Sequence, residues 1–323
     1  MKRFLPCLAL ICLLLSACAP APAEAEAGNG RLTVAATVFP AYDFARACAG
    51  DLADVTLLLP PGMESHSYEP TPADILTVRS CDLFLCLGGE SDAWVDTILS
   101  AVEPRGEVLR MVDCVELLEE EEDHDGHHHH DHGHEDEDED GHGLGELVGM
   151  DEHVWTSPAN AAAITRRIGE RLAEIDPGHA EVYRDNAERY ARQLEDLDRE
   201  FQTFFDGLED PVLVFGDRFP LLYFKDRYEL TCYAAFPGCA TQTEPSAATI
   251  AYLTGKVAEE GISTVWYIEF SNHLVADSIA EAAGARTAMF HTCHNVSKAE
   301  LEGGATYLSL MEGNLERLRQ ELG

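Results

Sequence analysis

The stretch PGHAEVYRDNAERYARQLEDLDREFQTFF, residues 177–205, is the most regular part of the chain and decides its fold. Apolar side chains recur along it at alternating spacings of four and three residues, so one apolar stripe runs along a single helix. The stripe consists of Tyr183, Ala187, Tyr190, Leu194, Leu197, Phe201 and Phe204. At 1.5 Å per residue, such a helix is on the order of 40 Å long, enough to cross two lobes. A coiled-coil partner is the competing interpretation, but the stripe is aromatic-rich and the other face lacks a sustained charge pattern, so we favour a rigid connecting helix.

Short, mostly apolar runs lie on both sides of this helix, separated by segments long enough for further helices. This alternation is typical of parallel sheets covered on both faces. Four runs come before the helix, at residues 32–38, 54–59, 83–87 and 107–111, and four come after it, at 212–215, 230–234, 264–269 and 287–290. We therefore predict an α/β fold: two βα (Rossmann-like) lobes with mainly parallel sheets, joined by one long connecting α-helix.

Helix starts and lobe boundaries follow from local signals. Thr71-Pro72, Ser157-Pro158 and Asp176-Pro177 each place a capping residue before a proline at the first helical position. The chain beyond its leader has about 300 residues, which suits two lobes of roughly 100 to 150 residues each. We assign residues 31–172 to an N-terminal lobe, 173–207 to the connecting helix and 208–323 to a C-terminal lobe.

The first residues predict export. Lys2 and Arg3 precede an apolar run that ends in Leu15-Ser16-Ala17-Cys18. The run is too short to span a bilayer, where about 20 apolar residues are needed, so we predict a signal peptide at residues 1–17. A small-residue cleavage site followed by cysteine resembles a bacterial lipobox, which implies cleavage before Cys18 and a lipid on its sulfur. Residues 18–30, rich in Ala, Pro, Glu and Gly, form the predicted flexible linker.

Charge and cysteine content narrow the possible partners. A formal net charge of −37 argues against nucleic acid and anionic lipid surfaces and favours cationic ligands. Seven cysteines follow Cys18, an odd and scattered set that is not a disulfide framework and whose pairing the sequence leaves open. They are Cys48, Cys81, Cys86, Cys114, Cys232, Cys239 and Cys293. Some of these are expected to be buried thiols.

Residues 119–142, EEEEDHDGHHHHDHGHEDEDEDGH, consist almost entirely of carboxylates and imidazoles. Because the run has no apolar face to offset the entropy of ordering, it is predicted to be a disordered loop within the first lobe. Imidazoles interleaved with carboxylates are typical of a divalent-metal scavenger, so we predict an accessory metal-binding loop. Its eight candidate ligands are His124, His127, His128, His129, His130, His132, His134 and His142.

Four histidines outside this run occupy predicted strand-end loops. His66 lies in PPGMESHSYEPTPAD, and His153 lies in MDEHVWTSPAN directly before a capped helix. His291 follows the last predicted strand, and His294 comes three residues later. Ligands in parallel α/β folds bind at the carboxyl ends of strands. Several such loops meeting in a cleft would provide the nitrogen-rich, four-coordinate shell that zinc prefers.

These loops also carry a family resemblance. PPGMESHSYEPTPAD, DEHVWTSP, DPGHAEVYRDNAERYARQLEDLD, DRFPLLYFKDRYEL and TEPSAATIAYLTGKVAEEGISTVWYIEFS occur in an order that resembles the metal-binding lipoproteins of ABC importers, the solute-binding proteins that take up zinc or manganese. The resemblance extends from about Leu32 to the C-terminus. It implies two βα lobes joined by one long helix, with a metal held between the lobes by four side chains.

The resemblance implies which residues bind the metal. The first two family ligands correspond to His66 and His153, although Ser65 and Glu152 stand where the family usually has proline. The third, a histidine or glutamate, falls in VFGDRFPLLYF, where Arg218 occupies the aligned position.

Because arginine cannot ligate a metal, Asp217, another residue or water must take the third position. The fourth ligand follows the last strand, where His291 fits best and His294 is second. Glu269 either orients a ligand from behind or pairs with Arg218.

The predicted function is the extracytoplasmic, high-affinity zinc-binding component of an ABC importer, a membrane-anchored lipoprotein that acts as a monomer and delivers Zn²⁺ to a permease. Imidazole-rich sites suit Zn²⁺ better than Mn²⁺, so a manganese-specific member is the nearest alternative. A zinc-dependent hydrolase is another, because three histidines around zinc with an open position also describe a hydrolytic site. A surface zinc buffer without a permease is the third. No H-E-x-x-H motif, nucleophile elbow or phosphate-binding glycine loop supports an enzyme.

Overall fold

The computed structural model describes residues 31–89, 92–120, 149–237 and 245–323. The predicted signal peptide, the linker with Cys18 and the eight histidines of the predicted metal-binding loop lie outside these residues. Leu32–Gly323 forms one compact unit that contains both sheets. Among the described residues, no helix combines the length and apolar character needed to cross a bilayer.

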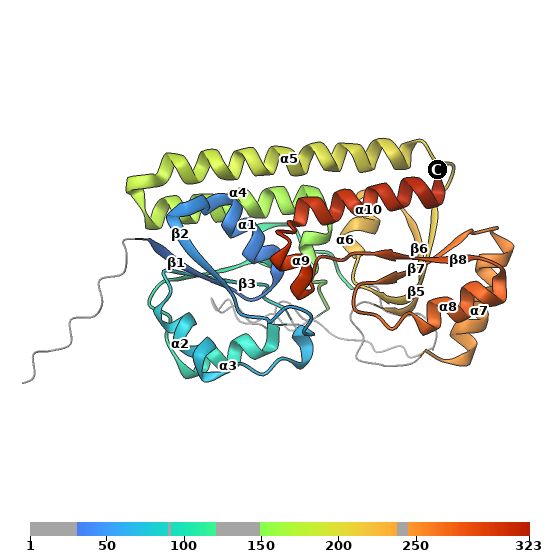
Figure 1. Ribbon diagram of the computed structural model, residues 1–323, viewed down its shortest axis with the longest axis horizontal. Coiled ribbons are helices and arrows are strands. Elements are labelled where there is room, and N and C mark those ends of the chain that lie inside the picture. Colours follow the sequence, from blue (N-terminus) through green and yellow to red (C-terminus); the bar gives the residue numbers. More distant parts are fainter. Residues whose placement is uncertain (1–30, 90–91, 121–148, 238–244) are drawn as a thin grey trace, which may run out of the picture. The chain divides into compact units, whose positions relative to one another are not determined.

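The first sheet has four parallel strands in the order β2-β1-β3-β4. They are β1 (Leu32–Ala36), β2 (Ala53–Leu57), β3 (Leu83–Cys86) and β4 (Glu107–Arg110). Figure 1 shows helices on both faces, with α1 (Phe39–Ala49) on one side and α2 (Pro72–Ser80) and α3 (Ala93–Ala101) on the other. All four strands overlap the predicted runs. Strand β3, which is buried at every position, is continuously apolar, as expected of a strand covered on both faces.

The second sheet repeats this arrangement with the order β6-β5-β7-β8, again all parallel. Its strands are β5 (Val212–Phe219), β6 (Thr231–Pro237), β7 (Thr264–Ile268) and β8 (Arg286–Phe290). The helices that follow β5 in the chain are α6 (Leu222–Arg227), α7 (Ala247–Glu259), α8 (Leu274–Ala283), α9 (Lys298–Glu302) and α10 (Tyr307–Leu322). The predicted fold class is therefore confirmed.

Strand β5 is longer than the sequence pattern predicts. Its pairing with β6 shifts register between Phe215 and Arg218, and Gly216 lies at the shift. A Cβ on Gly216 would come within 2.3 Å of the Ala276 Cα, so glycine allows β5 to contact α8 there. The irregularity carries Asp217 and Arg218 inside the strand rather than in a loop.

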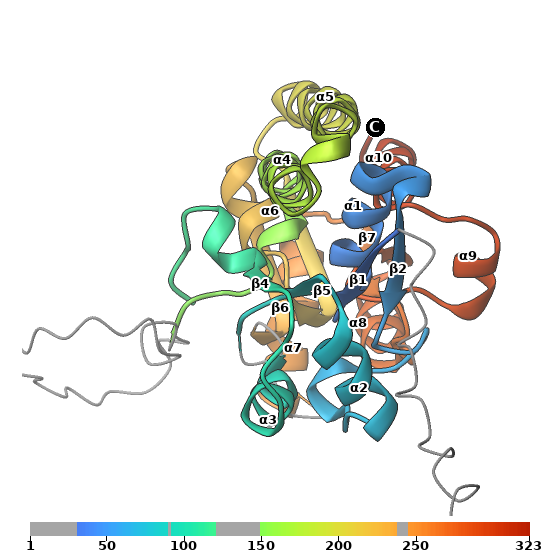
Figure 2. The same cartoon turned by 90° about the vertical axis from the view of Figure 1, so that its left-hand side faces the viewer.

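The connecting helix is α5 (Ala180–Asp206), whose 27 residues span about 40 Å. It begins after a 3-10 turn, Pro177–His179, rather than at Pro177. It packs against α4 (Pro158–Ile175), α1 and α10, and Figures 1 and 2 show α4 and α5 lying side by side.

Burial along α5 follows the predicted stripe with one shift at its end. Tyr183, Leu194 and Phe201 are buried, but Phe205 is more deeply buried than Phe204. The large apolar core contains residues of both sheets and of α5. A smaller core lies between the second sheet and the helices α7 and α8.

Candidate metal centre

His153 is held in a segment with little freedom. Its side chain is 2% exposed, and it directly precedes the 3-10 turn Val154–Thr156 that leads to α4. The Asp151 Oδ1 accepts a hydrogen bond from the His153 amide at 2.7 Å and lies 3.1 Å from its Nδ1. A carboxylate at Nδ1 favours the tautomer with its proton there, which leaves Nε2 as the metal-binding nitrogen. The residue missed by sequence reasoning is Asp151, whose D-x-H spacing before a capped helix was the available signal.

His294 lies next to His153 although it comes from the other half of the chain. The two ring centroids are 6.0 Å apart, and the His294 ring also packs 5.2 Å from that of Trp155. Burial, with smaller contributions from the charges of His153 and His66, lowers the pKa of His294 to about 3. The His294 imidazole is therefore neutral at physiological pH, as a metal ligand must be.

His66 joins this pair from an exposed position. It lies in the 3-10 turn Ser65–Ser67, where Ser65 is buried and His66 is exposed. The Ser65 Oγ lies 3.0 Å from the His294 Nε2, so the hydroxyl is hydrogen-bonded to this ring nitrogen. A metal ion bound to the same nitrogen would displace the hydroxyl. The turn therefore brings His66 near His294, consistent with the effect of its charge on the pKa of His294.

The loop that carries His66 is fixed at both ends. The Asn295 amide donates hydrogen bonds to the carbonyl oxygens of Pro60 and Met63, at 2.8 and 2.9 Å. On the far side, Thr71 and Asp74 form a capping box at the start of α2. Asn295, missed by the sequence analysis, follows His294 directly, so one short segment presents an imidazole and positions the loop opposite it.

His291 faces different surroundings from His294. Its Nδ1 accepts a hydrogen bond from the Cys293 amide at 2.9 Å, and its Nε2 lies 3.6 Å from the Glu300 Oε1. Its backbone N–H and C=O both pair with Asn314, at 2.8 and 2.7 Å. Cys293 has φ +63°, so the chain reverses between the two histidines and directs their rings to different environments. The structure thus places the second candidate, rather than the first, beside His153.

The predicted third position holds hydrogen-bonded and ion-paired groups. The Asp217 Oδ1 accepts from the Arg218 amide at 2.8 Å, and its Oδ2 accepts from the Ile268 amide at 3.2 Å. Arg218 donates a hydrogen bond of 2.9 Å to Glu64, which belongs to the first half of the chain. Glu269 does not pair with Arg218: it accepts from the Thr292 amide at 2.7 Å and hydroxyl at 2.6 Å, 3.6 Å from the His291 Nδ1.

A pocket of about 260 Å³ opens beside these groups, lined among others by Glu64, Asp217, Arg218, Glu269 and Phe270. Within residues 31–89, 92–120, 149–237 and 245–323, no three His, Cys, Asp or Glu side chains are already placed to hold a metal ion. Bringing His66, His153 and His294 to ligand distance therefore requires local movement. Of the three side chains, that of His66 is the most exposed.

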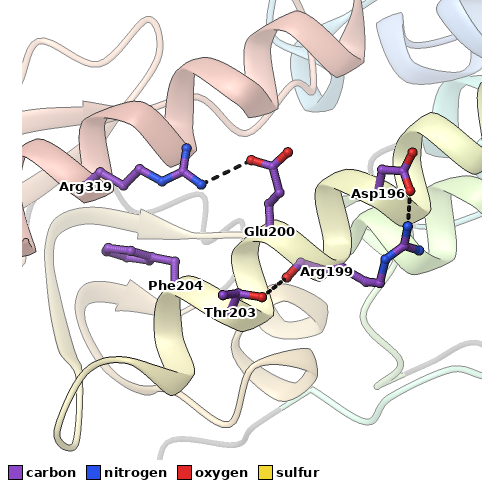
Figure 3. Close-up of a pocket in the computed structure, with 6 residues that line it drawn as sticks. All are labelled: Asp196, Arg199, Glu200, Thr203, Phe204 and Arg319. Carbon is purple, nitrogen blue, oxygen red and sulfur yellow. Dashed lines mark hydrogen bonds and ion pairs between the residues drawn. The ribbon is translucent and has the colours of Figure 1, made fainter.

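A larger hollow of about 580 Å³ lies elsewhere, between α5 and α10 (Figure 3). Ion pairs line it: Arg319 with Glu200 at 3.1 Å, and Arg199 with Asp196. Its lining contains neither imidazole nor thiol, so it does not have the donors of a zinc site.

The chain is similar over most of its length to known zinc-uptake proteins. The profile of the family described as zinc-uptake complex component A, periplasmic, matches residues 34–321. The high-affinity zinc uptake system protein ZnuA of Bacillus subtilis is 31% identical over 321 residues, covering 96% of this chain and 94% of that protein. The zinc-binding lipoprotein AdcA of Streptococcus pneumoniae is 28% identical, and the match covers 99% of this chain but 61% of AdcA.

Solved structures show the same fold. The Zn(II)-bound ZnuA-like domain of Streptococcus pneumoniae AdcA superposes with a TM-score of 0.72 at 25% identity, covering 90% of this chain and 99% of the domain. The metal-dependent lipoprotein YcdH of Bacillus subtilis superposes with a TM-score of 0.73 at 27% identity, covering 90% and 99%.

Proposed function

This chain belongs to the zinc-uptake complex component A family, the zinc-binding components of ABC importers, and on that premise we propose that His66, His153 and His294 hold the captured Zn²⁺. The observation that carries this ligand set is the position of His294, whose ring lies beside that of His153 while its Nε2 contacts the loop of His66. The two halves of the chain thus both contribute imidazoles to one place.

The donors support zinc over manganese. Three imidazoles form a borderline-soft nitrogen set that suits Zn²⁺, whereas Mn²⁺ sites rely on carboxylates and water. The fourth position falls to water in this proposal, because both oxygens of Asp217 already accept backbone hydrogen bonds and Arg218 carries a positive charge. His291 fits less well than His294, because its ring nitrogens lie 3.6 Å from Glu269 and Glu300, whereas the His294 ring lies beside that of His153.

A transport component carries out no covalent chemistry on its cargo. The family to which the chain belongs is a solute-binding part of an importer, which argues against the hydrolase alternative. Delivery to a permease follows from the same membership. Capture requires deprotonated imidazoles, so zinc affinity is expected to fall as the pH drops.

The membrane anchor and the lobe boundaries are part of the proposal. Cleavage before Cys18 and a lipid on its sulfur would tether a monomer through the linker at residues 18–30, outside the cytoplasm. The name of the related zinc-binding lipoprotein AdcA supports this anchoring. Residues 31–172 and 208–323 would then be the two lobes and 173–207 the connecting helix, with the histidine-rich run as an accessory loop that collects zinc.

Isothermal titration with Zn²⁺ and Mn²⁺ tests the ligand set through a matched pair of variants. We expect His294→Ala to abolish the tight zinc site and His291→Ala to retain it. Manganese binding more tightly than zinc, or a tight site that survives His294→Ala, would overturn the proposal.

Deleting the accessory loop distinguishes its weak zinc sites from the tight site. Glu119 and Met150 form an antiparallel bridge, and the Glu120 amide donates to the Gly149 carbonyl at 2.7 Å. Replacing residues 121–148 with Asn-Gly should therefore close a two-residue hairpin without strain. This variant should lose several weak zinc sites and keep one tight site. Loss of the tight site would place it in the deleted run instead.

A further inference from the structure

Tyr223 joins two segments that are distant in sequence from it. It lies in α6 with 4% of its surface exposed. Its hydroxyl donates a hydrogen bond to the Asp151 carbonyl at 2.7 Å and accepts one from the Leu118 amide at 3.1 Å. One side chain from the second half of the chain thus holds both Leu118 and Asp151 in the first half.

The segment held by Tyr223 is a short two-stranded pairing. Asp151 and Leu118 pair through one backbone hydrogen bond of 2.8 Å, and the neighbouring pair, Glu120 and Gly149, adds another of 2.7 Å. This short antiparallel ladder belongs to neither sheet, and an isolated two-stranded ladder is only marginally stable in water. The Tyr223 hydroxyl ties both of its strands to α6.

Helix α6 is such an element. Phe224, the neighbour of Tyr223, packs edge-on against Phe201 and Phe290 with ring centroids 5.2 Å apart in both pairs. Burial raises the pKa of Tyr223 to about 12, so its hydroxyl remains a donor throughout the physiological range. The anchor is therefore rigid and keeps its proton.

The residue that Tyr223 holds is hydrogen-bonded to a proposed zinc ligand. Tyr223 fixes the main chain of Asp151, and the side chain of the same residue contacts both the amide and the Nδ1 of His153. A shift of Asp151 would rotate the His153 imidazole and displace its Nε2. Outer hydrogen-bond partners of metal-binding histidines act in this way, by fixing the ring orientation and the tautomer.

We propose that Tyr223 is a positioning residue for His153: its hydroxyl, by clasping Leu118 and Asp151, sets the orientation of the imidazole and hence the residence time of the captured zinc. This inference rests on the proposed function, because it assumes that His153 binds the ion. Through these hydrogen bonds, a residue of the second half of the chain orients His153 in the first half, whether or not zinc is bound.

The test compares Tyr223→Phe with Tyr228→Phe. The second variant is a matched control, because the Tyr228 hydroxyl lies at the end of α6 and donates to Asp198 at 3.0 Å, away from the histidines. Zinc dissociation is measured by stopped-flow competition with a chelator, and the visible spectrum of the Co²⁺-loaded protein reports ligand geometry. We expect Tyr223→Phe to speed dissociation about tenfold and to alter the Co²⁺ spectrum, and Tyr228→Phe to do neither.

A double-mutant cycle with Asp151→Asn separates positioning from general destabilisation. If Tyr223 acts through Asp151, the double variant should release zinc no faster than Asp151→Asn alone. Additive effects, or equal behaviour of the Tyr223 and Tyr228 variants, would overturn the inference.

Zinc binding by His153→Ala distinguishes a failure of the proposed ligand set from a failure of the role of Tyr223. If this variant retained the tight site, the proposed ligand set would fail. If the tight site were lost while Tyr223→Phe behaved as wild type, only the role of Tyr223 would fail.

Discussion

His153 is buried and held at both its amide and its ring, whereas His66 lies exposed on a single 3-10 turn. Both histidines come from the first half of the chain; the His153 ring packs against that of His294, and His66 follows Ser65, which contacts the His294 Nε2. Asp151 and Tyr223 preorganise the first loop, while the second is anchored at its ends by Asn295 and the α2 cap. We infer that His153 supplies affinity, because its geometry exists before the ion arrives. We also infer that zinc enters and leaves on the side of His66, because this exposed side chain becomes ordered only when it binds the ion.

Removal of His153 is the most severe test of this contrast. Zinc affinity in four-ligand sites amounts to about 10–16 kcal/mol, so the loss of one protein ligand should cost roughly 3–4 kcal/mol. We expect His153→Ala to weaken zinc binding about a thousandfold. Competition against a chelator of known affinity measures the change. An effect smaller than that of His66→Ala would reverse the assignment of the two loops.

A buried carboxyl group outside the His153 loop, at the start of α3, carries an electrostatic cost that can be measured. Asp92 is 3% exposed, and burial, together with the charge of Glu152, raises its pKa to about 7, despite hydrogen bonds from Leu87 and Thr37. A carboxyl group whose pKa is raised by folding stabilises the protein below its unfolded pKa and loses that contribution as the pH rises through its folded pKa.

Asp92→Asn keeps the neutral form at every pH. We expect the metal-free variant to be more stable than wild type by about 4 kcal/mol at pH 8, with the difference vanishing near pH 4. Urea unfolding at the two pH values checks this. A difference that does not change with pH would show that Asp92 does not titrate between them.

Removal of His66 should cost less than removal of His153. An exposed side chain gives up conformational freedom when it binds the ion, and water can replace it, so we expect His66→Ala to weaken zinc binding about tenfold. The change should appear mainly in the dissociation rate, followed with a chelator. An equal slowing of association and no change in dissociation would contradict the role of His66 in release.

The smallest expected effect has the opposite sign. The bond between the Ser65 hydroxyl and the His294 Nε2 must break before that nitrogen binds zinc. Ser65→Ala should therefore raise zinc affinity about two- to fivefold, the value of one net hydrogen bond. Ser67→Ala in the same turn is the control, because Ser67 is exposed and its hydroxyl donates a long hydrogen bond, of 3.5 Å, to the Glu64 carbonyl. Weaker zinc binding by Ser65→Ala would show that this hydroxyl supports the site.

Much of the fold was predictable because it depends on local patterns. Most of the parallel strands are short, mainly apolar runs, and Thr71 and Ser157 cap helices as their sequence neighbours indicate. The limits of these patterns also have local causes. Strand β5 continues to Phe219 because Gly216 accommodates a register shift, which no alternation of residue types reveals.

The sequence by itself determined the class of fold, the length of α5 and the set of histidines that lie in strand-end loops, because periodicity and capping are properties of neighbouring residues. Only the tertiary structure decided which of those histidines meet. His291 and His294 are three residues apart in an irregular segment, and the reversal at Cys293 decides which ring faces His153. The hold of Tyr223 on Asp151 likewise joins residues 72 positions apart, a distance over which packing, not local sequence, sets the geometry.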